Sequence, residues 1–334
     1  MKILTTYPIP ESKRWQEVTV FIDRNSKKFK FLRSIFYKIG INDWWSPFKL
    51  LLLRNKFDVL FTGTEREDII FALFQLILPG RKIPHVMTCC LWKREENAFI
   101  KIFKKFLLKL IAKSVALFVV WSQEEIENYH KEFGIPKDKL KFIPHHSTLK
   151  GYNFKIYDGN YIFAGGNSSR DYITLIKAVQ NLSIKTIIAL TDYSLIKGIN
   201  IPNNVKVVSL SREEFRQYMA GSKMVVVPLK KNLLQSAGQQ TYLNAMSLRK
   251  PVIVSKVPGV EDYISNYETG IIVEPENSQA LRKAISFILN GNDEVKQMID
   301  KAYMVATRNY TLDKFVERNL YLINKYAVAN SNID

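Results

Sequence analysis

The chain has 334 residues, 47% of them hydrophobic, and this length suits two globular domains better than one. Lys and Arg number 49 against 31 acidic residues, so the net charge of +18 predicts a polyanionic partner such as nucleic acid, an anionic membrane or a phosphate-bearing substrate. No Lys/Arg-rich tract typical of a nucleic-acid-binding arm occurs, and no apolar run is long enough to span a bilayer. Cys89 and Cys90 are adjacent and poorly placed to bridge each other, which favours a reducing cytoplasm.

The N-terminal half combines basic and aromatic residues in two segments. A first strand is expected at residues 2–6, and residues 27–56 then alternate Lys and Arg with Phe, Tyr and Trp. A helix over 98–113 carries lysines at steps of four, with large apolar side chains beside them. Both segments suit an anionic membrane surface, or they are ordinary surface helices with solvated lysines.

A buried strand is expected at residues 57–62, and acidic residues follow its carboxyl end. Ligands of open α/β sheets bind at that end, so Glu65, Glu67 and Asp68 are candidates for a catalytic base. Acidic residues also stabilise the first turn of a helix, and that structural explanation suits the predicted helix over 69–78 equally well.

Two adjacent histidines, His145 and His146, follow the strand expected at 140–144, where the first domain should end. Neighbours on an extended segment point in opposite directions, so we expect at most one ring to face a site. That ring could contact phosphate or act as acid or base near neutral pH, or both could serve a structural hinge. No Cys/His/Asp cluster completes a metal site around them, so no metal is expected.

The second half begins with a strand at residues 161–164 and a glycine turn, Gly165 and Gly166. Asn167 and Arg170 come next, before a helix over 173–181. The guanidinium of Arg170 can bind phosphate through two hydrogen bonds and stabilise charge that develops there. Its alternative role is a surface salt bridge with Asp171.

Residues 236–274 carry the strongest signal of function. Ser236, Ala237 and Gly238 are small, Thr241 is a possible cap, and apolar residues at helical spacing predict a helix that begins near Gln239 or Gln240 and ends before residue 251. Residues 252–255 then read as a buried parallel strand. A glycine before a helix start lets backbone N–H groups point at an anion that the helix dipole also favours. The stretch therefore predicts a diphosphate site.

The same stretch resembles the nucleotide-sugar half of GT-B glycosyltransferases, above all those of family 4. Asn-Ala-Met-Ser-Leu-Arg-Lys-Pro-Val-Ile stands at residues 244–253, where the family writes Glu-Ala-Met-Ala-x-Gly-Lys-Pro-Val-Ile, and the likeness continues through residues 257–264 and 268–273. Gly238, Thr241 and Asn244 match the Gly-x-x-Thr-x-x-Glu helix start of related enzymes. Ser236 and Asn244 occupy the places of two family glutamates, and Cys90 that of a family histidine.

The resemblance implies that the donor is bound by residues in three loops and one helix. In the family, an Arg and a Lys that follow the glycine turn clamp the diphosphate, and only the second cation survives here, as Arg170. The turn near residue 210 reads the base in the family, and the helix start holds phosphate and ribose. The implied donor-binding residues are Gly165, Gly166, Asn167, Arg170, Leu210, Ser211, Ser236, Gly238, Gln239, Gln240, Thr241 and Asn244. The candidate catalytic residues are Arg170, His145, His146 and Glu65.

The expected fold is therefore α/β, of the GT-B type, with two Rossmann-like domains that face each other across a cleft. Residues 1–148 would bind the acceptor, residues 152–310 the nucleotide sugar, and residues 311–327 would form a helix that packs back on the first domain. The expected function is sugar transfer from a nucleoside-diphosphate sugar to a glycan or lipid-linked acceptor at the cytoplasmic membrane face. The absence of Asp-x-Asp predicts no essential metal or other cofactor, and family 4 implies retention of configuration.

Two other classes of function compete with this interpretation. A degenerate, non-catalytic GT-B module would explain the missing carboxylates, and it would bind nucleotide without releasing sugar from any donor. A nucleic-acid binder would explain the charge, and it would show a steep salt dependence of affinity for duplex.

Overall fold

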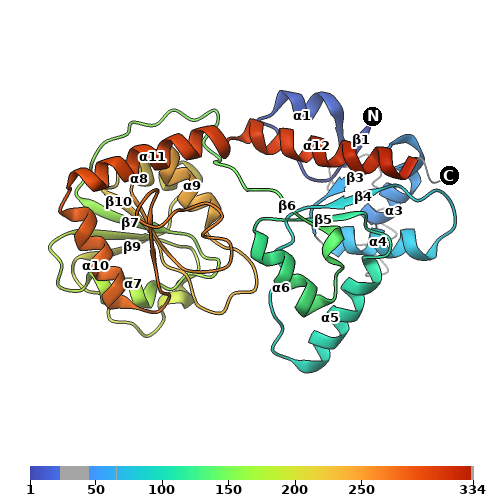
Figure 1. Cartoon of the computed structure of the whole chain (residues 1–334). Coiled ribbons are helices and arrows are strands. Elements are labelled where there is room, and N and C mark those ends of the chain that lie inside the picture. Colours follow the sequence, from blue (N-terminus) through green and yellow to red (C-terminus); the bar gives the residue numbers. More distant parts are fainter. Residues whose placement is uncertain (23–44, 65, 332–334) are drawn as a thin grey trace. The chain divides into compact units, whose positions relative to one another are not determined.

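The computed structural model describes residues 1–22, 45–64 and 66–331 (Figure 1). The chain divides into two compact units: unit 1 consists of Met1–Ile143 and Phe315–Asp334, and unit 2 of Pro144–Lys314. Each unit contains one six-stranded sheet in which every strand pair is parallel. This architecture confirms the predicted α/β fold class.

The sheet of unit 1 has the order β2-β1-β3-β4-β5-β6. Its strands are β1 (Ile3–Thr5), β2 (Thr19–Phe21), β3 (Val59–Thr62), β4 (His85–Met87), β5 (Leu117–Val120) and β6 (Leu140–Phe142). The helices are α1 (Lys13–Val18), α3 (Trp45–Leu53), α4 (Arg66–Ile77), α5 (Ala98–Ile111), α6 (Gln123–Phe133) and two single turns, η3 (Arg54–Lys56) and η4 (Lys137–Lys139). β3, β4 and β5 are buried along their whole length, as expected for parallel strands covered by helices.

The sheet of unit 2 has the order β12-β11-β10-β7-β8-β9. Its strands are β7 (Tyr161–Gly165), β8 (Lys185–Ala189), β9 (Val205–Val208), β10 (Met224–Val227), β11 (Val252–Ser255) and β12 (Ile271–Val273). The helices are α7 (Tyr172–Val179), η5 (Tyr193–Ile196), α8 (Arg212–Ala220), α9 (Gln239–Ser247), α10 (Ser278–Leu289) and α11 (Asp293–Asn309), and α12 (Leu312–Ser331) leads back to unit 1. One apolar core joins the sheet to α7, α10 and α11.

After the expected first strand, the N-terminal segment forms a short helix and a second strand. Ser12 caps α1, its Oγ accepting from the backbone N–H of Trp15 at 3.3 Å, and β2 then pairs with β1. Trp15 is buried and meets Phe61 edge to face, with 5.1 Å between ring centroids. This tertiary contact stabilises a helix of six residues that has no clear apolar period of its own.

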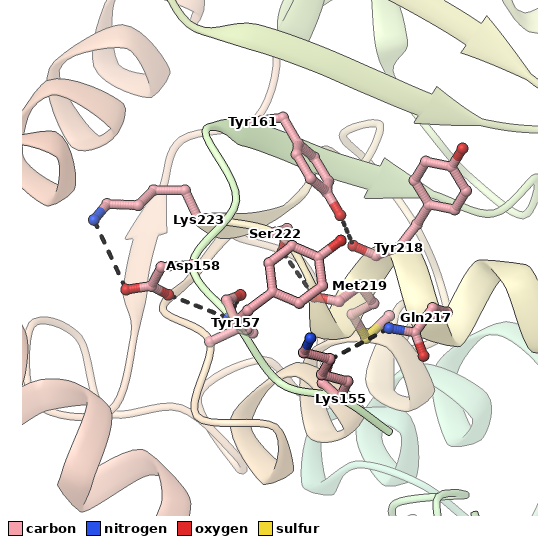
Figure 2. Close-up of polar contacts among 10 residues, drawn as sticks. Lys155, Tyr157, Asp158, Tyr161, Gln217, Tyr218, Met219, Ser222 and Lys223 are labelled. Carbon is pink, nitrogen blue, oxygen red and sulfur yellow. Dashed lines mark hydrogen bonds and ion pairs between the residues drawn. The ribbon is translucent and has the colours of Figure 1, made fainter. Parts of the chain in front are cut away.

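The segment over 152–159 packs on unit 2 at the amino ends of β7 and β10 (Figure 2). The buried ammonium of Lys250 donates to the carbonyl of Tyr157 at 2.8 Å and to the carboxylate of Asp158 at 3.3 Å. Gly159 donates its N–H to the carbonyl of Gly221 at 2.9 Å. We call residues 152–159 the strap.

Candidate donor site

The candidate site lies at the carboxyl edge of the unit 2 sheet, where the strand order reverses. From β7 the chain proceeds outward through β8 and β9, and from β10 it proceeds outward in the other direction. β7 and β10 are neighbours, so the loops that follow them run in opposite directions, and such a switch point is the usual ligand site of open α/β sheets. Arg170 lies in the first loop and forms a bridge with Leu229 in the second.

Arg170 is 5% exposed and connects the loop after β7 to the start of α9. Its Nε donates to the carbonyl of Gly165 at 3.0 Å, its Nη1 to the carbonyl of Ser168 at 3.0 Å, and its Nη2 to Oγ1 of Thr241 at 3.1 Å. Burial lowers the pKa of Arg170 from its usual value, although an arginine remains protonated at neutral pH. The loop therefore holds a buried, fixed positive charge.

No carboxylate of the described residues lies within 4.0 Å of this guanidinium. The expected alternative, a salt bridge with Asp171, is wrong: Asp171 instead caps α7, its Oδ1 accepting from the backbone N–H of Thr174 at 3.1 Å. A buried charge without a counter-charge is costly to a fold unless a ligand compensates it. Arg170 is thus suited to bind an anion.

The N-terminus of α9 adds to this positive field. The helix begins at Gln239, as predicted, but the N-cap position is Gly238, which has no side chain to accept from the first N–H groups. The predicted capping role of Thr241 is therefore wrong, since its hydroxyl accepts from Arg170. Gln239 is 4% exposed, and its Nε2 has no partner among the described residues. Helix dipole, guanidinium and amide all favour a negative group here.

Three glycines give this region its close packing. A Cβ on Gly165 would lie 2.2 Å from the ring of Phe215, and one on Gly166, whose φ is +111°, would lie 2.9 Å from Nη2 of Arg170. Gly238 has a φ of +84°, and its Cβ would lie 2.8 Å from Cγ1 of Val227. Larger residues at Gly165, Gly166 and Gly238 would thus displace the ring of Phe215, the guanidinium and the helix start, respectively.

Asn167 holds the loop after β7 to the loop after β8. Its Oδ1 accepts from the N–H groups of Thr191 and Asp192 at 2.9 and 3.1 Å, and its Nδ2 donates to Oγ1 of Thr191 at 2.8 Å. Leu210 and Ser211 follow β9, two strands away from β7, and Ser211 forms a capping box with Glu214 at the start of α8. The three predicted residues share the carboxyl edge, but no described hydrogen bond joins them to Arg170.

Asn244 is buried and bonded to the segment that opens unit 2. Its Oδ1 accepts from Oγ of Ser147 at 3.0 Å and from the N–H of Thr148 at 2.8 Å, and its Nδ2 donates to Oγ1 of Thr148 at 3.1 Å. Gln240 donates to the same hydroxyl at 2.9 Å. Ser236 is also buried. The amide at the predicted ribose position thus orders residues 147–148 beside α9.

The rings of His145 and His146 stack in parallel, with centroids 5.0 Å apart and planes 10° apart. The expectation that they point in opposite directions is therefore wrong. The turn is folded back on itself: the N–H of His146 donates to Nδ1 of His145 at 2.8 Å, and the N–H of His145 donates to the hydroxyl of Tyr263 at 2.9 Å. Desolvation, and secondarily the neighbouring His146, lowers the pKa of His145 to about 3, so this ring is neutral at physiological pH.

Among the predicted acidic residues of unit 1, Glu65 lies outside the described residues. Glu67 and Asp68 stand in the first turn of α4, and Asp68 is fully buried, accepting from Oγ1 of Thr6 at 3.3 Å. β1 and β3 are the strands at which the order of this sheet reverses. Within residues 1–22, 45–64 and 66–331 no cluster of three His, Cys, Asp or Glu side chains is suited to a metal ion.

Two aromatic residues complete the site, and the sequence analysis did not identify either. The hydroxyl of Tyr172 donates to the carbonyl of Gly166, while Phe215 covers Gly165 and meets Phe163 edge to face. Tyr172 directly follows the Arg-Asp pair that opens α7, and that adjacency is the one signal that could have pointed to it.

Comparisons with known proteins agree with this geometry. Residues 170–305 match the model of the family "Glycosyl transferases group 1", which begins at Arg170 and includes α9. No curated protein sequence matches the chain.

Solved structures share the fold at low sequence identity. HepE of Anabaena in complex with UDP is 15% identical with a TM-score of 0.72, and the match covers 97% of this chain and 100% of that one. Sucrose-phosphate synthase of Thermosynechococcus elongatus is 16% identical with a TM-score of 0.68 and coverage of 93% and 84%. A glycosyltransferase of Rickettsia africae is 15% identical with a TM-score of 0.65 and coverage of 97% and 89%. The chain thus has the GT-B fold of these solved structures, and its residues 170–305 are similar to the glycosyl transferases of group 1.

Proposed function

We propose that the chain transfers a sugar from a nucleoside-diphosphate sugar to a glycan or lipid-linked acceptor, with the diphosphate bound between Arg170 and the start of α9. The single observation that carries this proposal is the buried Arg170, which lies at the N-terminus of α9 without a described carboxylate partner. A diphosphate would supply the missing negative charge. HepE is described in complexes with UDP and with UDP-glucose, which makes uracil the first base to test.

The proposed chemistry needs charge stabilisation at the leaving group. As the bond to the sugar breaks, negative charge grows on the diphosphate, and preorganised donors at that position lower the barrier. Arg170 supplies charged N–H groups that its three hydrogen bonds hold in place, and α9 supplies uncapped backbone N–H groups. We propose a metal-independent reaction on this basis, with retention of configuration as family 4 implies.

The acceptor is proposed to be a glycan or lipid-linked precursor held by unit 1 at the inner face of a membrane. TarM of S. aureus, 14% identical with a TM-score of 0.66, is described with Fondaparinux, alpha-GlcNAc-glycerol and UDP, which supports a glycan acceptor. That match covers 85% of this chain and 59% of that one. No helix in the described ranges is long and apolar enough to cross a bilayer.

The donor site is tested by ligand-induced thermal shift with UDP, GDP, ADP, CMP and their sugar conjugates. A ligand that binds only the folded chain raises its Tm, so one nucleoside diphosphate should do so selectively. Arg170→Ala should abolish this shift. The matched control is Arg282→Ala, since Arg282 is half-buried and donates to the carbonyls of Lys177 and Gln180 away from the site. Equal shifts in both variants would refute the assignment.

One observation favours the second candidate, a module that binds nucleotide without turnover. Asn244, at the position of a family carboxylate, is already bonded to Ser147 and Thr148. If this candidate holds, UDP raises the Tm of the wild-type chain, yet no sugar is released or transferred from any donor conjugate. Release of nucleoside diphosphate from one donor, together with free or transferred sugar, decides for the enzyme.

A further inference from the structure

Helix α5 of unit 1 exposes its apolar face to solvent. Four large side chains at spacings of three and four residues form this face, which we call the α5 stripe: Phe99 is 85% exposed, Ile102 67%, Phe103 64% and Phe106 64%. The buried residues of the helix, Leu108 and Ile111, lie towards its C-terminal end. Exposed apolar residues in a continuous row on a soluble domain mark an interaction surface.

The lysines of α5 divide into two groups around this stripe. Lys101 and Lys104 face their own unit, where Lys101 pairs with Glu132 at 3.1 Å and Lys104 with Glu95 at 2.6 Å. Lys105 and Lys109 are exposed and follow Ile102 and Phe106 by three residues each, so they line one edge of the stripe, with their stems beside Gly134. Residues 98–113 contain five lysines and no acidic residue.

This combination of charges decides which partner fits. Two copies of the chain that paired through the α5 stripe would bring the flanking lysines of both copies together, with no acidic residue of either helix between them. An anionic lipid surface takes up the apolar row below its headgroups and pairs with the lysines at headgroup level. The net charge of +18 adds a general attraction to such a surface.

We infer that α5 lies in the interface of an anionic bilayer, with Phe99, Ile102, Phe103 and Phe106 inserted among the acyl chains and Lys105 and Lys109 at the phosphates. The inference rests on the proposed function for its biological purpose, which is to bring unit 1 to the membrane that contains a lipid-linked acceptor. The binding itself needs no donor and is measured separately.

The test is sedimentation of the full chain with vesicles of phosphatidylcholine, alone or containing about one third phosphatidylglycerol. The wild-type chain should bind the anionic vesicles and leave the neutral ones largely free. The variant Phe103→Ser/Phe106→Ser should lower the partition constant about tenfold or more, because two exposed aromatic anchors are lost. Lys105→Gln/Lys109→Gln should weaken binding and flatten its salt dependence.

The matched control is Ile173→Ser/Met304→Ser, which removes two exposed apolar side chains, 43% and 52% exposed, from helices of unit 2. It should bind vesicles like the wild type. If Phe103→Ser/Phe106→Ser binds anionic vesicles as strongly as the wild type, the inference is wrong. It is also wrong if the wild-type chain does not bind anionic vesicles and instead forms dimers that Phe103→Ser/Phe106→Ser does not form. The Tm shift with UDP, measured on the same variant, should stay unchanged, so failure of the donor site and failure of docking are distinguishable.

Discussion

Gly238→Ala tests whether the start of α9 depends on the absence of a side chain. The residue has a φ of +84°, and a left-handed conformation costs an L-residue roughly 1–2 kcal/mol. The new Cβ would also lie 2.8 Å from Cγ1 of Val227 inside a buried strand, and overpacking of this kind costs about 1–3 kcal/mol. The free energy of unfolding of unit 2 should therefore fall by about 2–5 kcal/mol.

Gly198→Ala separates the cost of the left-handed backbone from the cost of overpacking. Its φ is +76°, but no atom lies within 4 Å of the added Cβ, so only the backbone cost of roughly 1–2 kcal/mol remains. Urea unfolding followed by far-ultraviolet circular dichroism measures both variants. All five tryptophans belong to unit 1, so their fluorescence identifies the transition of that unit. If Gly238→Ala costs no more than Gly198→Ala, close packing at the helix start is not what requires glycine.

Three further predictions concern residues away from the helix start. Burial lowers the pKa of His85 to about 3 from the ordinary 6.5. The contribution of the neutral His85 to the free energy of unfolding is therefore complete above pH 6.5 and is lost as the pH falls towards 3, by roughly 2 kcal/mol at pH 5. Tryptophan fluorescence of unit 1 during unfolding should show this loss in the wild type and much less of it in His85→Gln. Asp171→Ala should cost about 1 kcal/mol through the lost cap of α7, whereas Asp171→Asn should cost little; a large loss of UDP binding in Asp171→Asn would instead restore a charge role for this carboxylate. Gly221→Ala should destabilise unit 2, because its Cβ would lie 2.5 Å from the ring of Tyr157, and the added change Tyr157→Ala should recover part of the loss; strictly additive effects would contradict this contact.

The parts of unit 2 that depend on local pattern could be predicted from the sequence. The strand before Gly165, the helix start at Gln239 and the strand after Pro251 follow from glycine, proline and apolar runs, and all three are confirmed. The environment of Arg170 could not be predicted in this way. Its partners lie up to 71 residues away, and only the folded sheet brings Thr241 to the guanidinium.

Errors in prediction came where tertiary contacts override local rules. Alternation along an extended segment predicted opposite directions for His145 and His146, but hydrogen bonds fold the backbone there and stack the rings. The pattern of α5 correctly indicated an amphipathic helix, yet periodicity alone does not say which face is turned towards the protein. The lysine side of its first turns is the one that forms ion pairs with its own unit.

The strap sets a limit on where unit 2 can be separated from the rest of the chain. Figure 2 shows Lys155, Tyr157 and Asp158 beside Gln217, Tyr218 and Lys223, near Tyr161, the first residue of β7. A fragment that begins at Tyr161 would leave the buried ammonium of Lys250 without both of its acceptors. Because Ser147 and Thr148 also bond the buried Asn244, unit 2 needs the chain from Pro144 onward, and a protease site or fusion junction belongs before that position.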